Sequence, residues 1–184
     1  MTIELLNNTT NKEQKENQLL IFTCAIIGML IFLGTNSALF TVTAFLLCSF
    51  VCVQFPLDFS FSVMLFILPM ATIFKLAPGQ ASLFTFAQLI WVVCAFWKSG
   101  MQATKTDVCI MLFSFYLIIC QIFNGGLSIS ATLKLTFGLL MVGAIRNRKL
   151  YGSYVSMFLC YISGVFTSSL LMYIDSPLFK ITTY

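Results

Sequence analysis

Few residues in this sequence carry side chains suited to catalysis or metal binding. The 184 residues include seven cysteines and no histidine. Without histidine the chain has no Cys–His pair and no Ser–His–Asp triad, and it contains no P-loop, GxGxxG, GxSxG or paired-carboxylate motif. Cys48 and Cys52 share one helix face at a spacing of four, but two sulfurs alone make a poor zinc site. We therefore interpret the cysteines as small apolar residues and expect neither a metal nor a cofactor.

Two lysines, Lys75 and Lys134, are the candidate site residues. Lys134 lies within the apolar run 127–145, and Lys75 follows the end of the apolar run 59–74. A charge inside a membrane span is costly and marks a functional candidate, but a long lysine stem also carries its ammonium group to the membrane surface. The sequence leaves both interpretations open. In the first, two ammonium groups in the outer half of a bundle would hold a pyrophosphate, because lysine is a compact point charge for phosphate oxygens.

The composition indicates what surrounds these lysines. Hydrophobic residues make up 59% of the chain and charged residues 9%, whereas a soluble domain has about 25% charged residues. Lipid is therefore the expected solvent for most of the chain, and a backbone in lipid has to satisfy its own hydrogen bonds. The sequence predicts an all-α fold, a polytopic transmembrane helical bundle.

Seven apolar runs follow a polar N-terminal tail. The tail covers residues 1–18, the predicted bundle covers residues 19–174, and residues 175–184 form an external tail or begin an external loop. A spanning helix needs about 20 apolar residues, so the first and third runs are short, and a re-entrant segment is the alternative for either. The runs cover residues 19–33, 38–55, 59–74, 82–97, 108–123, 127–145 and 151–174.

The charges of the loops predict the orientation of the bundle. With the N-terminus inside, the inner segments hold seven cations and the outer segments hold two, Lys75 and Lys180, while Lys134 lies within a span. This excess agrees with the positive-inside rule. The basic segment Arg146–Lys149 then lies on the inner side, as an ordinary anchor or as a contact for anionic lipid headgroups. We expect about seven spans, with the N-terminus inside.

One stretch resembles a known family. Residues 65–93 read LFILPMATIFKLAPGQASLFTFAQLIWVV, with Leu68-Pro69 in a short helix, Phe74-Lys75-Leu76 before a Pro-Gly turn, and Ser82-Leu83-Phe84-Thr85 opening the next helix. This pattern resembles the early part of bacterial O-antigen and capsular polysaccharide polymerases, which are similar in layout to the O-antigen ligases. Some such proteins also have an internal cation in a later helix, as Lys134 is here.

The resemblance implies a glycosyltransferase of surface-polysaccharide biosynthesis in the bacterial cytoplasmic (inner) membrane. Such an enzyme transfers a polyprenyl-pyrophosphate-linked glycan to another lipid-linked repeat unit. External cations would stabilise the departing pyrophosphate, as preorganised charges do elsewhere. The implied partners are the lipid-linked glycan, the lipid bilayer and other polysaccharide-assembly proteins, with no nucleic acid.

This sequence also departs from the family. The family has a large external loop that carries its arginines and, in ligases, a histidine, whereas here the only arginines, Arg146 and Arg148, are predicted inside. No catalytic residue can therefore be assigned, and whether this chain is an enzyme stays open. We expect an N-terminal portion of a polymerase that ends before its catalytic loop.

Two other functions stay open. The first is a fragment of a lipid-linked oligosaccharide flippase or transporter. Transporters tend to show internal repeats and broken helices. Here Pro69 is the one proline well inside a span, and there is no repeat between residues 18–97 and 108–174, so the sequence favours this alternative less. The second is a small accessory membrane protein, which only the length of the chain favours.

Overall fold

The computed structural model describes residues 2–35, 37–75, 82–98, 104–124, 135–141 and 154–174, and every regular element within them is helical. This confirms the predicted all-α fold class. Residues 135–141 form a further short helical segment. The named elements are α1 (Thr2–Gly34), α2 (Ala38–Gln54), α3 (Leu57–Ile67), the 3₁₀ turn η1 (Leu68–Met70), α4 (Leu83–Lys98), α5 (Lys105–Asn124) and α7 (Tyr154–Ile174).

The limits of most helices agree closely with the predicted apolar runs. The second run was expected at 38–55 and α2 covers Ala38–Gln54, while the fourth was expected at 82–97 and α4 covers Leu83–Lys98. The main difference is at the start of the chain, where α1 begins at Thr2, so the polar tail continues the first apolar run as one helix. Residues 2–18 contain neither proline nor glycine and are rich in helix-forming Glu, Lys, Gln and Leu, so nothing in them interrupts the helix.

The third predicted run, 59–74, is broken rather than continuous. The α-helix ends at Ile67, and η1 and a turn complete the run to Phe74. Pro69 explains the break, because proline has no N–H for an α-helical hydrogen bond and its ring clashes with the preceding turn. The backbone tightens into 3₁₀ geometry instead, with Ala71 N–H donating to Leu68 O at 3.2 Å.

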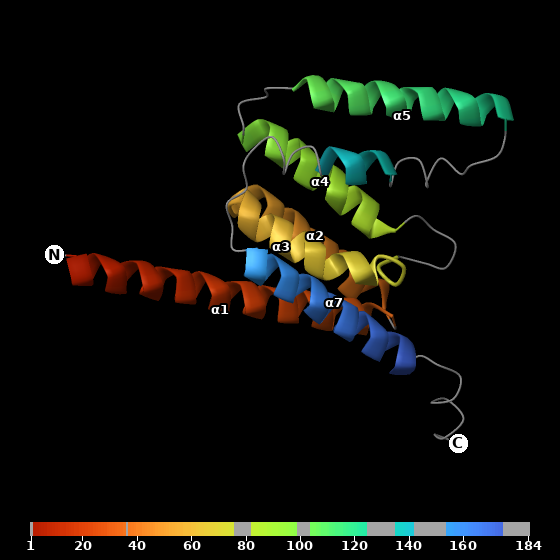
Figure 1. The fold of residues 1–184 in the computed structure, drawn as a ribbon. Coiled ribbons are helices and arrows are strands. Elements are labelled where there is room, and N and C mark those ends of the chain that lie inside the picture. Colours follow the sequence, from red (N-terminus) through yellow and green to blue (C-terminus); the bar gives the residue numbers. More distant parts are fainter. Residues whose placement is uncertain are drawn as a thin grey trace, which may run out of the picture.

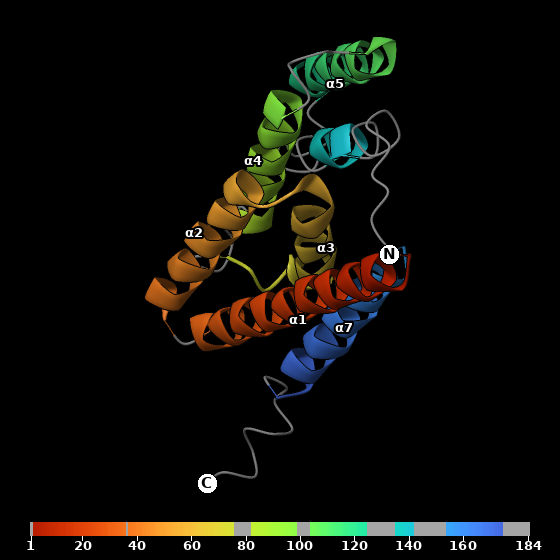
Figure 2. The ribbon, with the colours of Figure 1, turned by 90° about the vertical axis from the view of Figure 1, so that its left-hand side faces the viewer.

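Helix α3 is the central element of the bundle. It contacts α1, α2, α4 and α7, and α7 also packs along η1 (Figures 1 and 2). Helix α2 lies between α1 and α4 and packs against both. In both views α5 lies at the edge of the bundle farthest from α1 and α7.

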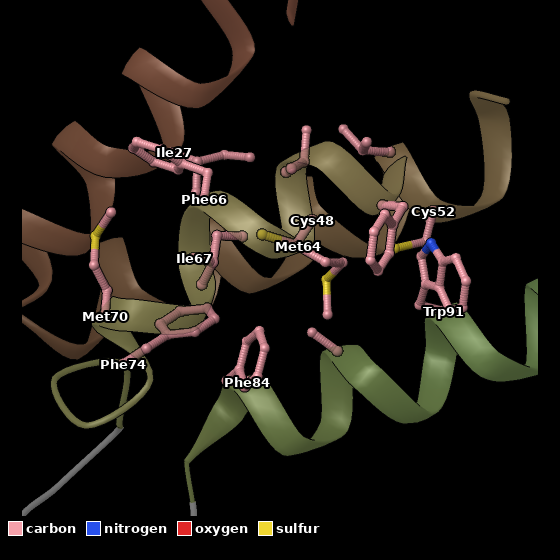
Figure 3. Packing of buried hydrophobic residues seen from close by; sticks show 14 of the residues in the cluster. Ile27, Cys48, Cys52, Met64, Phe66, Ile67, Met70, Phe74, Phe84 and Trp91 are labelled. Atoms are coloured by element: carbon pink, nitrogen blue, oxygen red, sulfur yellow. The ribbon is translucent and has the colours of Figure 1, made fainter. Parts of the chain in front are cut away.

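The core forms where α1, α2, α3, η1 and α4 meet (Figure 3). Trp91 on α4 is fully buried, and its indole ring lies against Phe61 of α3 with ring centroids 5.5 Å apart. The indole N–H donates to Ser60 Oγ at 3.0 Å, so the polar atom of this large side chain is satisfied inside the bundle. Most other core members are apolar, among them Ile27, Ile67, Met70 and Phe74.

Within the part of the chain that the structure describes, two helical stretches are long and apolar enough to cross a membrane: Gln14–Gly34 of α1 and Tyr154–Tyr173 of α7. The apolar stretches Ala38–Gln54, Leu57–Met70 and Leu83–Lys98 are shorter. At about 1.5 Å per residue, the 17 residues of α2 extend about 25 Å, which is slightly less than a hydrocarbon core of about 30 Å. The first apolar run, 19–33, is part of the longer helical stretch Gln14–Gly34, so its helix is not short. This corrects the expectation of a short first span, which was based on the length of the apolar run alone.

Helix α5 has an inverted distribution of polarity. Among its side chains that the structure describes, the two buried ones are polar, Asp107 and Ser114. Apart from Lys105 in its first turn, its exposed large side chains are apolar: Val108, Met111, Leu112, Phe113, Phe115, Tyr116, Ile119 and Phe123. A helix in water would show the opposite pattern, because its apolar stripe would face the core.

Candidate functional site

The connection from η1 to α4 positions Lys75, the first candidate residue. The Ser82 hydroxyl lies within hydrogen-bond distance of the carbonyl oxygens of Ala71 and Phe74, at 3.1 Å from Phe74 O. Leu83 N–H donates to Phe74 O at 2.9 Å. Ala71 and Phe74 precede the connection, and Ser82 and Leu83 follow it. These hydrogen bonds therefore hold the two ends of the connection together. Ser82 is buried, so this clasp belongs to the packed part of the bundle.

Lys75 follows directly after the clasp. Phe74 is fully buried and anchors the backbone, and Lys75 N–H donates to Ile73 O at 2.8 Å. The Lys75 side chain is half-buried, and among the described residues its ammonium group has no hydrogen-bond or ion-pair partner. Asp58 lies at the opposite end of the same α3–η1 segment, too far along the chain to neutralise it.

The N-terminus of α4 adds no free donors to this site. Leu83 N–H is bound to Phe74 O, Phe84 N–H to Ser82 Oγ at 3.3 Å, and Thr85 N–H to Ser82 O at 3.0 Å. Helix N-termini bind anions through unsatisfied N–H groups, and here the first three are already paired. An anion at this place would therefore depend on the Lys75 side chain.

The second candidate residue, Lys134, lies outside the described residues, one position before the helical segment 135–141. That Lys134 and Lys75 together hold a pyrophosphate stays a prediction. The basic segment 146–149 and the tail 175–184 also lie outside the described residues.

Helix α7 carries a stripe of small residues, which our sequence reasoning missed. Ser156, Cys160, Gly164 and Ser168 recur every fourth residue and so lie on one helix face. Each of them contacts another helix. Small residues at a spacing of four are a known signal for close packing of membrane helices, so this signal was present in the sequence.

The contacts of this stripe are specific. Ser156 Oγ donates to Asn17 Oδ1 of α1 at 3.2 Å, and Ser168 Oγ donates to Pro69 O of η1 at 3.0 Å. Gly164 lies against the backbone of Phe66: a Cβ atom added there would be 2.1 Å from Phe66 O. Only glycine permits this approach of α7 to α3.

The fourth member, Cys160, belongs to a line of cysteines. Cys160 and Cys24 on α1 are neighbours in the bundle, and Cys48 on α2 is the next neighbour of Cys24. Cys52 follows one turn along α2, and beyond it lies Cys94 of α4. All seven cysteines are reduced, and the described residues contain no group of three or more His, Cys, Asp or Glu side chains that could hold a metal ion.

Lys98 ends α4 and stabilises the C-terminus of α2. Its ammonium group donates to Cys52 O at 2.8 Å and also to Phe55 O. The last carbonyl groups of a helix lack partners within the helix and carry partial negative charge. Lys98 is thus a helix-capping cation, in contrast to Lys75.

No family of known proteins, no curated protein and no solved structure matches this chain. The geometry described above is therefore the basis for any functional assignment.

Proposed function

We propose that this chain is a multi-pass protein of the bacterial cytoplasmic membrane that acts in surface-polysaccharide polymerisation. In this proposal it forms part of the membrane groove for a polyprenyl-pyrophosphate-linked glycan, and Lys75 and Lys134 contact the pyrophosphate. Lys75 carries the proposal, because its side chain is half-buried and no described residue neutralises its charge. A lysine of this kind suits the phosphate oxygens of a lipid donor.

The outer surface of the helices supports the membrane part of the proposal. Helix α7 exposes large apolar side chains along its length, and Phe166 and Val155 are 70% and 67% exposed. Its buried positions are Met157, Gly164, Ser168 and Leu171. Large apolar groups on the outside of both α5 and α7, with small or polar groups among the buried ones, fit a bundle that lipid surrounds.

The directions of α1 and α7 support the predicted number of spans. Asn17 of α1 is hydrogen-bonded to Ser156 of α7, and Gly28 of α1 contacts Thr167 of α7. The second contact lies 11 residues after the first along both helices, so α1 and α7 run parallel. Parallel first and last spans require an odd number of crossings between them. Five crossings, as in the predicted seven-span layout, satisfy this requirement.

Binding of the lipid donor is the experiment that tests this function. The full chain in lipid nanodiscs is titrated with a polyprenyl pyrophosphate, with the corresponding monophosphate for comparison, and bound lipid is counted by native mass spectrometry. We expect a preference for the pyrophosphate. Lys75→Gln should weaken binding about 10-fold or more, because a hydrogen bond to a charged group contributes about 1.5–3 kcal/mol, and Lys134→Gln should also weaken it.

Lys105→Gln is the matched control. Lys105 is an exposed lysine in the first turn of α5 and belongs to the predicted inner side. Its loss removes the same charge without touching the proposed site, so binding should stay unchanged. Equal losses for Lys75→Gln and Lys105→Gln, or no preference of the unmodified chain for pyrophosphate, would overturn the proposal.

A further inference from the structure

Two polar side chains of α4 are buried without a hydrogen-bond partner. Thr85 and Gln88 are each 6% exposed. The hydroxyl oxygen of Thr85 is fully buried, and nothing in the described part of the bundle bonds to it. The amide of Gln88 likewise makes no hydrogen bond to a described residue. The two residues are three positions apart and so share one face of the helix, whereas Phe86, Leu89 and Val93 mark its exposed face.

The position of Thr85 in its helix explains why its hydroxyl group lacks a partner. A helical threonine often donates to the carbonyl oxygen four residues earlier, as Thr43 does to Leu39 O at 2.9 Å. Thr85 lies in the first turn of α4, so the position four residues earlier precedes the helix. Buried polar groups without a partner are rare, and each one calls for an explanation. A bound ligand that supplies the missing hydrogen bonds is one.

The pair lies close to Lys75. The Ser82 hydroxyl is hydrogen-bonded to Phe74 O, and Thr85 N–H donates to Ser82 O at 3.0 Å. Thr85 is therefore within one helical turn of the clasp that holds the backbone of Lys75. Gln88 lies about 5 Å further along α4, at about 1.5 Å per residue. The two polar side chains thus extend from the Lys75 site into the bundle.

The surroundings of the pair favour a neutral ligand group. The one charged residue of α4 is Lys98 at its other end, and the one charged residue of α3 is Asp58 in its first turn. A buried charge without a partner is costly, so an anion would stay at Lys75. A threonine hydroxyl and a glutamine amide can each both donate and accept hydrogen bonds. The hydroxyl groups of a sugar have the same double character.

We propose that Thr85 and Gln88 form a subsite that binds the hydroxyl groups of the sugar next to the pyrophosphate. This inference rests on the proposed function, in which Lys75 contacts the pyrophosphate of a lipid-linked glycan. The subsite divides the head of that lipid into two parts. The charged pyrophosphate lies at the lysine, and the first sugar lies against the neutral pair.

The test compares lipids that differ only in the sugar. The full chain in lipid nanodiscs is titrated with a polyprenyl pyrophosphate, either bare or carrying one glucose, galactose or N-acetylglucosamine, and bound lipid is counted by native mass spectrometry. We expect at least one of the three glycosylated lipids to bind about 10-fold more tightly than the bare lipid, because it supplies hydrogen bonds to two buried groups that otherwise lack them.

Variants assign this gain to the pair. Thr85→Val and Gln88→Met keep the approximate size of each side chain and remove its hydrogen-bonding groups. Each should remove about 3-fold or more of the gain from the sugar and leave the affinity for the bare lipid unchanged. Neither variant breaks a hydrogen bond of the described bundle, so unfolding in mixed micelles should not become easier. Thr43→Val, the same change on the exposed side of α2, is the matched control and should keep the full gain.

The outcomes separate this inference from the function on which it rests. Equal binding of bare pyrophosphate and monophosphate lipids would overturn both. A preference for pyrophosphate with no gain from any of the three sugars would overturn the subsite alone and leave its polar groups to ordered water. A gain that persists in both Thr85→Val and Gln88→Met, or an equal loss in Thr43→Val, would also overturn the subsite.

Discussion

Gly164→Ala should weaken the bundle at the crossing of α7 and α3. An added Cβ atom would lie 2.1 Å from Phe66 O, 2.9 Å from Phe66 C and 3.1 Å from Phe66 Cα. Main-chain atoms of a packed helix cannot move aside individually, so α7 has to shift away from α3. The shift also stretches the hydrogen bond from Ser168 to Pro69 O, which lies one turn further along α7.

The size of the effect follows from three contributions. Overpacking of a tight contact costs about 1–3 kcal/mol. A weakened hydrogen bond between membrane helices adds about 0.6 kcal/mol. Alanine favours the helix over glycine by about 1 kcal/mol, which offsets part of the cost. We expect the free energy of unfolding to fall by about 0.5–2.5 kcal/mol.

Gly138→Ala provides the matched control for this substitution. Gly138 lies in the helical segment 135–141, and no described atom lies within 4 Å of a Cβ atom added there. The same chemical change should therefore leave stability unchanged or raise it by up to about 1 kcal/mol. Unfolding of both variants in mixed micelles by increasing dodecyl sulfate, followed through the fluorescence of the buried Trp91, gives the two free energies. Equal values for the two variants would refute the close approach of α7 to α3.

Three further substitutions test the contacts that hold the bundle together. Trp91→Phe keeps an aromatic ring but loses the hydrogen bond to Ser60 Oγ, so unfolding should become easier by about 1 kcal/mol; the double variant with Ser60→Ala should cost less than the sum of the two single variants, measured in the same micelle assay. Lys98→Met keeps an apolar stem but removes the cap on Cys52 O, so hydrogen exchange should speed up in the last turn of α2 and stay unchanged in α7. Ser82→Ala removes the clasp to Phe74 O, so it should lower both the stability, by about 1 kcal/mol, and the lipid binding attributed to Lys75; loss of stability with unchanged binding would separate the clasp from the site.

Local features of the sequence predicted the helices well. Polar or proline residues bound the second and fourth apolar runs, and the limits of α2 and α4 differ from these runs by at most one residue at either end. Pro69 was noted as the one proline well inside a span, and the α-helix of the third run ends just before it because proline lacks the N–H that an α-helix needs. The N-terminal tail was expected to lie outside the first helix, but its polar residues favour helix as well as solvent, so polarity alone did not mark the start of α1.

The sequence determined that this chain folds as helices with largely apolar surfaces, because apolar runs and helix breakers act within a few residues of one another. It did not determine which helix faces pack together. In a soluble helix the apolar stripe marks the buried face, but here almost every face is apolar, so hydrophobicity does not distinguish core from surface. Tertiary structure decided the close approach of Gly164 to Phe66, the meeting of Cys24 with Cys160, and the contrast between the capping lysine, Lys98, and Lys75. Each of these features depends on how closely two segments more than 40 residues apart in the sequence approach one another. In a bundle of apolar helices, shape and hydrogen bonding control this approach, and hydrophobicity does not.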